Sequence, residues 1–385
     1  MANPESLKVL SIQPFGGGSH QAFMEGWSQY SIHQWQNLQL PPRHWKWRMR
    51  HAALYFANEV DQRWQAGSRW DSIFTTDMLN VAEFRGLLKT KARDIPTGLY
   101  FHENQIAYPN RHNDPRDLHF AFTNLTSTLA ADYVWFNSEY NRASLVSGLS
   151  EAARQWPDFA PYSEIETITA KSEVQAPGIH PPPEAENLSA ERAGPIHLVW
   201  AARWEHDKNP DDLLHVLRAL QQRQLAFRIS IIGQSFRQQP AAFDAIRQEF
   251  QDKILHWGFQ SSRDSYWRVL SQADLFLSTA IHEFYGLSVI EGLAAGLVAV
   301  LPNRLAYPEI AQRLANSSGE VVLYDDLDQC VQQVSSCSER LSEIRAGRGP
   351  RRAIPEITET TWPSRSAQLD RALARSVKSI SRQSP

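Results

Sequence analysis

The sequence predicts an α/β protein made of two Rossmann-like domains, and three observations support that fold class. Short apolar runs alternate with helical stretches in both halves of the chain, which is typical of parallel βαβ units. A proline-rich segment at 176–195 separates the two series of runs. The 385 residues are also too many for one ordinary domain.

The N-terminal domain is expected to span residues 1–180, and it contains four short apolar runs. Each run is rich in aromatic or β-branched residues and is followed by polar or turn residues, as strands of a buried sheet are. Between the first two runs, Ala53, Phe56 and Val60 recur at the spacing of a helix with one buried face. The four predicted strands are 7–13, 70–76, 97–103 and 133–138.

The C-terminal domain is expected to span residues 181–360 and to repeat the alternation. A helix is predicted over 211–222, with Asn209 as its N-cap and Pro210 at its first position, where the missing N–H costs no hydrogen bond. The segment 361–385 is predicted to form a helix over 362–375 that packs back on the first domain. The six predicted strands are 196–202, 227–233, 253–259, 274–279, 297–303 and 320–325.

The composition is that of a globular protein and excludes several functional classes. Hydrophobic residues make up 42% and charged residues 21% of the chain, and the net charge of -3 argues against a generally basic coat for nucleic acid. Cys330 and Cys337 lie seven residues apart, so both can face one side of a helix, and they form no metal or disulfide pattern. No basic leader and no apolar run of about 18 residues is present. We therefore expect a cytoplasmic protein.

The segment 282–300 contains the strongest candidate site. From Gly286 onward its only charged residue is Glu291, and a buried carboxylate is costly unless hydroxyls such as those of a ribose hydrogen-bond to it. Gly286 predicts a tight turn into a helix whose first N–H groups, near Leu287 and Ser288, can bind a diphosphate. Glu283 precedes this turn and can reach a sugar. The alternative is a solvated loop glutamate and a helix glutamate paired with a core arginine.

The segment 201–210 adds two cations where a predicted strand ends. Arg203 and Lys208 flank a short loop, and Lys208 lies immediately before the N-cap of the next helix. A cation is unfavourable there because the helix macrodipole places positive charge at the N-terminus. A bound anion between the two side chains would remove this conflict. The alternative is a pair of solvated surface cations.

Polar residues also follow the third predicted strand. His102, Glu103 and Asn104 lie at its carboxyl end, and ligands of open α/β sheets bind at the carboxyl ends of strands. These side chains are therefore placed to meet an acceptor or a leaving group. The alternative for His102 is a purely structural histidine.

A glycine cluster follows the first predicted strand. Gly17 and Gly18 allow a substrate to approach the backbone closely, and Ser19 and His20 can donate hydrogen bonds. The spacing is not a full dinucleotide fingerprint, so it indicates such a ligand only weakly. A tight strand–helix turn is the alternative explanation.

The segment 41–56 is the one best suited to RNA. Its cations alternate with tryptophans, and cations contact phosphates while aromatic faces stack on bases. The alternative is an amphipathic surface helix. The candidate RNA-binding residues here are Arg43, Trp45, Lys46, Trp47, Arg48 and Arg50.

Several of these motifs coincide with known families. The E-x7-E element from Glu283 to Glu291, with Arg203 and Lys208, resembles the retaining GT-B glycosyltransferases of the glycogen-synthase and mannosyltransferase type. The motifs FGGGSH, HWKWRMRHAALYF and FHENQIAYPNR resemble the tRNA-queuosine mannosyltransferases more narrowly. This resemblance extends from about Leu7 to the closing helix.

The resemblance implies a GT-B fold, with two Rossmann-like domains facing each other across a cleft. It also implies retaining transfer of mannose from GDP-mannose to the cyclopentenediol of queuosine in a tRNA. No metal is expected, since cations and a helix end would replace it and no D-x-D element is placed to hold one. By the family pattern, Arg203 and Lys208 would bind the diphosphate, Glu283 the donor sugar and Glu291 the ribose, while His102 would lie near the reacting carbon and Gly17 and Gly18 would line the cleft. His20, Glu103 and Asn104 join the basic segment as candidates for acceptor binding.

Other functions stay open on the sequence alone. A GT-B enzyme could use another nucleotide sugar, galactose included, or a non-tRNA acceptor such as a lipid, a polysaccharide or a small metabolite. A non-catalytic module that binds a nucleotide sugar or RNA is a second alternative, and a sugar-nucleotide epimerase of the same fold is a third. The joint presence of Glu283, Glu291, Arg203 and Lys208 favours a catalyst over a binding module.

Overall fold

The computed structural model describes most of the chain. Its ranges are 6–108, 118–180 without 157 and 159, 194–236, 239–314, 321–346 and 359–382. Most of the proline-rich linker therefore lies outside the described residues. The chain divides into two compact units, one formed by 1–178 with 360–385 and one by 179–359. The two units are described separately.

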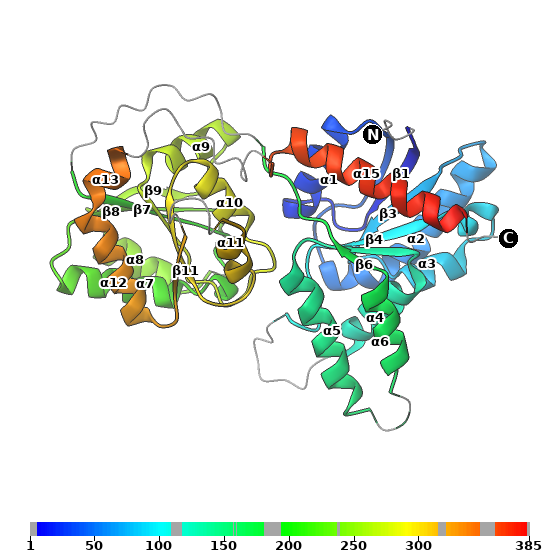
Figure 1. The fold of residues 1–385 in the computed structure, drawn as a ribbon, viewed down its shortest axis with the longest axis horizontal. Helices are drawn as coiled ribbons and strands as arrows, with labels where there is room; N and C mark the ends of the chain where they lie inside the picture. Colours follow the sequence, from blue (N-terminus) through cyan, green and yellow to red (C-terminus); the bar gives the residue numbers. More distant parts are fainter. Residues whose placement is uncertain are drawn as a thin grey trace. The chain divides into compact units, whose positions relative to one another are not determined.

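The first unit is built on a six-stranded parallel sheet in the order β2-β1-β3-β4-β5-β6 (Figure 1). The four predicted strands are present, and two further strands form the edges. The sequence QWQNLQ of β2 contains no apolar run because an edge strand leaves much of its surface to solvent. The strands are β1 (Lys8–Gln13), β2 (Gln34–Gln39), β3 (Ser72–Thr76), β4 (Thr97–Phe101), β5 (Tyr133–Phe136) and β6 (Ser172–Val174).

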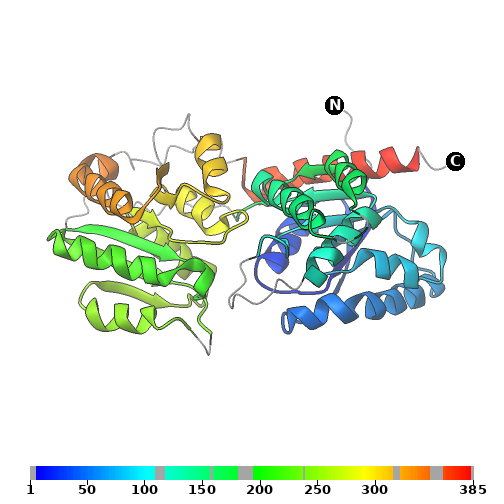
Figure 2. The ribbon, with the colours of Figure 1, turned by 90° about the horizontal axis from the view of Figure 1, so that it is seen from below.

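Helices cover both faces of this sheet (Figure 2). On one face, Ala53 and Phe56 of α2 pack with Leu10 and Ile12 of β1. Alternate strand residues point to the other face, where Val9 packs with residues of α1 and α15. The helices are α1 (Gly18–Tyr30), α2 (Trp45–Gln65), α3 (Val81–Leu87), α4 (Leu118–Ala130), α5 (Glu139–Ala153), α6 (Tyr162–Ala170) and α15 (Trp362–Ser381), with a short 3-10 helix η1 (Lys91–Asp94).

The closing helix α15 packs on α1 and is six residues longer than predicted. Asp370 joins the two helices, because its buried carboxylate accepts hydrogen bonds from Trp27 Nε1 at 2.8 Å and from the backbone N–H of Ile32 at 2.9 Å. Trp362 fills a space next to Gly26, where a Cβ would come within 2.1 Å of the indole. The C-terminal segment is therefore part of the core of the first unit.

Replacing Asp370 by alanine is expected to destabilise the first unit by about 3 kcal/mol, because it leaves a buried indole N–H and a backbone N–H without acceptors. Urea unfolding followed by tryptophan fluorescence measures the loss. Arg371→Ala, on the exposed side of the same helix, serves as the control and should change little. Equal stability of the two variants would contradict the role given to Asp370.

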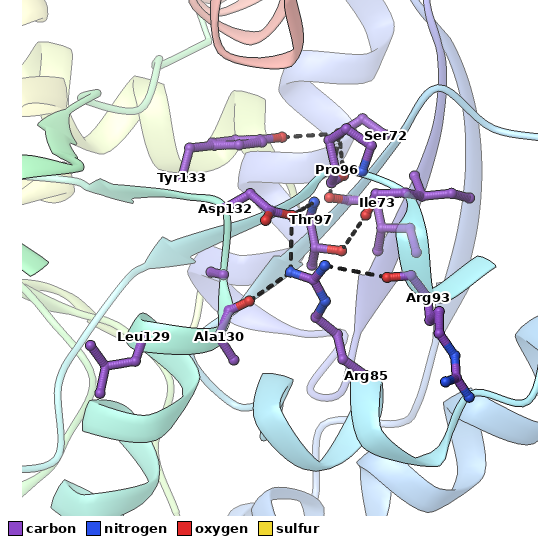
Figure 3. A network of polar contacts seen from close by, with 12 residues as sticks. Ser72, Ile73, Arg85, Arg93, Pro96, Thr97, Leu129, Ala130, Asp132 and Tyr133 are labelled. Atoms are coloured by element: carbon purple, nitrogen blue, oxygen red, sulfur yellow. Dashed lines mark hydrogen bonds and ion pairs between the residues drawn. The ribbon is translucent and has the colours of Figure 1, made fainter. Parts of the chain in front are cut away.

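Charged and polar groups stabilise this sheet at the amino ends of its central strands (Figure 3). Arg85 of α3 donates to Asp132 Oδ2 at 3.0 Å and to the Ala130 carbonyl at 2.7 Å. The same carboxylate oxygen accepts from the Thr97 N–H at 2.8 Å, at the start of β4. This network stabilises the amino ends of the strands. The residues predicted to bind ligands lie at the other ends of the strands, the carboxyl ends.

The second unit repeats the architecture with the parallel sheet β12-β11-β10-β7-β8-β9. All six predicted strands are present, and Asn209 caps α7 with Pro210 at its first position, as predicted. Cys330 and Cys337 both lie buried on one side of α12, also as predicted. The strands are β7 (Ile196–Ala201), β8 (Phe227–Ile232), β9 (Ile254–Gly258), β10 (Leu275–Leu277), β11 (Val298–Pro302) and β12 (Val321–Tyr324).

The helices of the second unit divide between the two faces of its sheet. Residues of α7, α8 and α12 form one core with the strands, and α9 and α10 contact β7, β10 and β11 separately from that core. None of the described helices is long and apolar enough to span a membrane. The helices are α7 (Pro210–Gln222), α8 (Ala242–Glu249), α9 (Arg263–Gln272), α10 (Leu287–Ala294), α11 (Tyr307–Leu314), α12 (Leu327–Glu339) and α13 (Leu341–Ala346), with the 3-10 helix η2 (His206–Lys208).

Candidate active site

The strand order of the second unit defines where a ligand binds. The chain proceeds from β7 outward to β8 and β9, then returns to β10 on the other side of β7 and continues to β11 and β12. The carboxyl ends of β7 and β10 therefore meet at a topological switch point, the usual ligand site of open α/β sheets. The segments with Arg203, Lys208 and Glu283 follow these two strands.

Lys208 and Glu283 meet at this switch point. The Nζ of Lys208 lies 3.3 Å from Glu283 Oε2 and donates to the His282 carbonyl at 2.7 Å. Asp207 Oδ2 lies 3.3 Å from the same Nζ. Two carboxylates of the chain therefore already offset the charge of Lys208 at the helix start, and the anion expected between Lys208 and Arg203 stays a prediction.

Both partners of this pair are charged at neutral pH. Burial opposes the charge of Lys208, but Glu283 and Asp207 outweigh it and raise the pKa of the ammonium group. Burial likewise opposes the charge of Glu283, but Lys208 and the N–H groups of Tyr285 and Gly286 outweigh it and lower the pKa of the carboxyl. The site thus holds a fixed cation and a fixed hydrogen-bond acceptor side by side.

Arg203 is more exposed than Lys208. Its side chain is 49% exposed and pairs with Glu205 at 3.0 Å. An exposed ion pair contributes little stability, about 0–1 kcal/mol. Arg203 can therefore exchange Glu205 for a phosphate at small cost, whereas Lys208 is held in place by its partners.

The helix α10 begins as the sequence predicts. Gly286 has φ +86, which favours glycine, and a Cβ there would lie 3.0 Å from Ile310 Cδ1. Its first turn contains Leu287 and Ser288, no acidic residue and no capping side chain on the N-cap glycine. The positive end of the helix therefore points toward the switch point. Lys208, Glu283 and Ser288 line a small cavity of about 10 Å³ beneath it.

Glu291 lies on the next turns of α10 and is already hydrogen-bonded. Its carboxylate is 5% exposed and contacts Arg263 NH2 at 2.7 Å and the Tyr266 hydroxyl at 2.8 Å. A buried carboxylate was expected to need ribose hydroxyls, and in the structure two side chains of α9 supply part of that need. Each carboxylate oxygen can accept two hydrogen bonds, so capacity remains for a ribose. The pairing of Glu291 with an arginine agrees with the alternative interpretation, although Arg263 is half-exposed and not part of the core.

Sequence reasoning missed Arg263 and Tyr266. Their spacing of three residues places them on one face of α9, and Arg263 also lies over the Tyr266 ring, 5.5 Å from its centroid. This local pair indicates a helix face but not its partner. Only the packing of α9 beside α10 brings the pair to Glu291.

The pKa of His282 gives the second unit a pH-dependent stability. Burial and nearby Lys208 lower the pKa of this imidazole from 6.5 to about 4. Between these values the unfolded chain binds a proton that the folded unit does not, so the free energy of unfolding falls as the pH falls from 6.5 to about 4. The loss is on the order of 3 kcal/mol. We expect His282→Gln to lose most of this dependence.

Urea unfolding at several pH values between 7 and 4.5 measures this effect. His215→Gln, on the exposed side of α7, is the matched control and should keep the wild-type dependence. An unchanged dependence in His282→Gln would show that the imidazole does not stay neutral in the folded unit.

In the first unit, His102 lies at the carboxyl end of β4, buried against His20 of α1. The two ring centroids are 4.1 Å apart. Burial and the neighbouring His20 hold the pKa of His102 well below its usual range, and its buried Nε2 has no hydrogen-bond partner. A neutral imidazole with a vacant nitrogen can position an acceptor hydroxyl by hydrogen bonding.

Asp77 is a further residue that sequence reasoning missed here. It follows β3 directly, is 2% exposed, and accepts a hydrogen bond from the His102 N–H at 3.0 Å. Burial and the nearby Glu103 raise the pKa of the Asp77 carboxyl well above its usual range. Glu103 thus lies close to the histidine pair, as its position in the sequence suggested. The signal for Asp77 was its place at a strand end.

Two predicted contact residues of the first unit have structural roles instead. Asn104 is fully buried, and its side chain donates to Asn141 and Ser144 and accepts from the Ala107 N–H. It therefore fixes the loop after β4 and is not available to an acceptor. At Gly17 a Cβ would lie 2.4 Å from the Pro42 side chain, so packing already requires glycine.

The region around Gly18 differs from Gly17. Gly18 has φ +57, and a Cβ there would meet no atom within 4 Å. The residue is exposed at the start of α1. A ligand can therefore approach the backbone here, which agrees with the prediction for this position.

The basic segment leads into α2 and forms its first turns, and its residues separate into exposed and buried ones. Arg48 is 8% exposed and donates to the Pro41 carbonyl and toward the His51 ring, so it does not present a cation to RNA. Trp45 is partly buried against Phe120. The side chains that remain exposed are Arg43, Lys46, Trp47 and Arg50.

A metal centre is not evident among the described residues. No group of three or more His, Cys, Asp or Glu side chains is arranged there to bind a metal ion. The switch point of the second unit presents the cations Arg203 and Lys208 and the N-terminus of α10.

The comparisons with known proteins agree with this architecture. Sucrose-phosphate synthase from Thermosynechococcus elongatus matches 97% of this chain and all of its own with a TM-score of 0.68 at 13% identity. A glycosyltransferase from Rickettsia africae matches 99% of this chain and all of its own with a TM-score of 0.67 at 14% identity. The two parallel sheets and these likenesses define the fold as GT-B, that of a glycosyltransferase.

Sequence comparison gives the family. Residues 8–179 match the family described as tRNA-queuosine alpha-mannosyltransferase N-terminal, and residues 184–339 match glycosyl transferases group 1. A tRNA-queuosine alpha-mannosyltransferase from Drosophila melanogaster is 35% identical over 326 residues, which cover 80% of this chain and 84% of that protein. The chain belongs to the tRNA-queuosine alpha-mannosyltransferase family.

Proposed function

We propose that this protein transfers mannose from GDP-mannose to the cyclopentenediol of queuosine in tRNA, with retention of the anomeric configuration and without a metal ion. The Drosophila relative is named as a tRNA-queuosine alpha-mannosyltransferase. A more distant relative from Xanthomonas oryzae, 26% identical over 143 residues, is named for GDP-mannose. The observation that carries the proposal is the Lys208–Glu283 pair beside the start of α10.

In the proposed reaction the second unit binds the donor. The bond between the anomeric carbon and the phosphate oxygen breaks, and its electron pair stays on the leaving GDP. Arg203, Lys208 and the N-terminus of α10 stabilise the growing negative charge without reorganising. Glu283 hydrogen-bonds sugar hydroxyls and favours the oxocarbenium-like sugar, while Glu291 binds the ribose.

The acceptor hydroxyl attacks from the face that the phosphate leaves. Its oxygen forms the new bond to the anomeric carbon, and its proton passes to the departing phosphate oxygen. A separate general base is therefore not required. The neutral His102 imidazole positions the acceptor through a hydrogen bond, which is consistent with its low pKa.

The exposed part of the basic segment is proposed to bind the tRNA. Arg43, Lys46 and Arg50 would contact phosphates, and Trp47, which is 60% exposed, would stack on a base. With a net charge of -3 for the chain, the attraction to RNA must come from such a local face. A tRNA substrate also favours a cytoplasmic location.

The test is transfer of labelled mannose from GDP-mannose to purified tRNA, with queuosine-containing and queuosine-free tRNA compared directly. Label on the queuosine-containing tRNA alone, unchanged by EDTA, supports donor, acceptor and metal independence together. No label on either tRNA, with GDP-mannose still bound by the protein, would contradict queuosine in tRNA as the acceptor. Loss of transfer in EDTA that added Mg²⁺ or Mn²⁺ restores would overturn the metal-independent mechanism.

A further inference from the structure

A polar cavity in the first unit is lined by side chains that have no role in the proposed reaction. It has a volume of about 250 Å³ and is lined by Gln13, Gln21, Met24, Glu25, Asn37 and Gln39. A single water molecule needs only about 10–15 Å³. The space is therefore large enough for an organic ring rather than for isolated water.

The sheet face beneath α1 changes character along β1 and β2. At the amino end Val9 pairs with Trp35, and both belong to the aromatic core under α1 and α15. Two and four residues further, Ser11 pairs with Asn37 and Gln13 pairs with Gln39. The same face is thus apolar at one end and amide-bearing at the carboxyl end, where ligands of such sheets bind.

Gln13 forms the floor of this cavity and is incompletely satisfied. It is 2% exposed, its Nε2 donates to Ser11 Oγ at 3.2 Å, and its buried Oε1 has no hydrogen-bond partner. If the amide were turned over, the other end would lack a partner instead. A buried polar group left in this state is costly, so its presence beside a cavity indicates a ligand that completes it.

The side chains that line the cavity indicate which class of ligand it can bind. The six lining residues include no cation, and Glu25 adds a carboxylate that Gln21 contacts at 2.6 Å. Such a lining disfavours phosphate and suits an uncharged group with several donors and acceptors. Carboxamides pair with the edges of nucleobases, and enzymes that modify a base extrude it into a pocket.

The position of the cavity agrees with an acceptor site. Gln21 follows His20 in α1, so the cavity and the His20–His102 pair share the start of this helix. A Cβ on Gly16 would lie 3.1 Å from Gln39 Oε1, which places the glycine loop at its edge. We propose that this amide-lined cavity binds the modified nucleoside of the acceptor, base edge and diol, an inference that rests on the proposed function.

Two variants on β2 test this proposal, Asn37→Ala and Gln39→Ala. Both side chains are exposed on an edge strand, so the fold should persist. We expect each to raise the KM for queuosine-containing tRNA about ten-fold through lost hydrogen bonds, and the double variant to raise it further, with the KM for GDP-mannose unchanged. Gln34→Ala, exposed on the same strand but pointing to the opposite face, is the matched control and should behave as wild type.

A second measurement does not depend on transfer. Saturation-transfer NMR with free queuosine nucleoside or guanosine as the probe, with and without inorganic phosphate as a competitor, should show nucleoside binding to the wild type and a loss in the double variant. Displacement of the nucleoside by phosphate, no nucleoside binding to the wild type, or an unchanged tRNA KM in the double variant would each overturn the inference. If the wild type binds the nucleoside and the variant does not, but no mannose is transferred, the proposed reaction fails and the cavity assignment stands.

Discussion

Replacing Glu283 by glutamine is expected to lower kcat for mannose transfer by about 10²–10³-fold. The amide keeps the shape of the side chain but removes the negative charge that Lys208 and the N–H groups of Tyr285 and Gly286 hold in place. In the proposed reaction that charge supports the developing cation on the sugar. Because GDP lacks the sugar, its binding should change little, so the loss should appear in transfer and not in the Kd for GDP.

Steady-state kinetics and calorimetry with GDP separate these two effects. Glu249→Gln removes the carboxylate of another ion pair in the same unit, with Arg218 on the surface, and should leave kcat unchanged. Near-normal transfer by a folded Glu283→Gln protein would mean that the carboxylate does not act on the donor sugar.

Replacing Lys208 by alanine should affect both binding and transfer. The ammonium group is the buried cation of the proposed diphosphate site, and its loss leaves Asp207 and Glu283 as two close carboxylates without their shared partner. We expect transfer to fall about 10³-fold and GDP to bind more weakly, because charge on the leaving phosphate is no longer offset. The protein should also be less stable, since breaking a buried pair costs about 3–5 kcal/mol.

A second variant separates the loss of stability from the loss of transfer. Combining Lys208→Ala with Asp207→Asn removes one of the two carboxylate charges left without a partner and should recover stability without recovering transfer. Lys253→Ala, beside Asp252 at 4.0 Å in the same unit, is the control for removing a lysine. Recovery of transfer in the double variant would show that Lys208 is needed for folding rather than for chemistry.

Six of the predicted strands, β3, β4, β5, β7, β10 and β11, are buried along their whole length. In β7 every residue from Ile196 to Ala201 is buried, and such a strand must be a continuous apolar run. The edge strand β2 was not predicted because its side chains lie in three different environments. Leu38 points into the core, Gln36 accepts from the Trp70 indole, and Asn37 lines the polar cavity.

The position of Glu291 was also readable from sequence. An isolated acid in an apolar helix must be buried or bonded, and in the structure it is both. Its partners were not readable, because Arg263 and Tyr266 lie 28 and 25 residues away in the chain. Asp77 was not predicted for the same reason, because the residue it contacts, His102, is distant in the chain and follows a neighbouring strand.

The sequence by itself determined the two βαβ series, the turn at Gly286 and the carboxylate spacing of Glu283 and Glu291. These features depend on residue order, periodicity and the cost of burying charge, which act locally. The tertiary structure alone decided which side chains are free to meet a ligand. Arg48 and Asn104 look like contact residues in the sequence, yet packing buries both, because burial and pairing depend on residues that approach only when the chain folds.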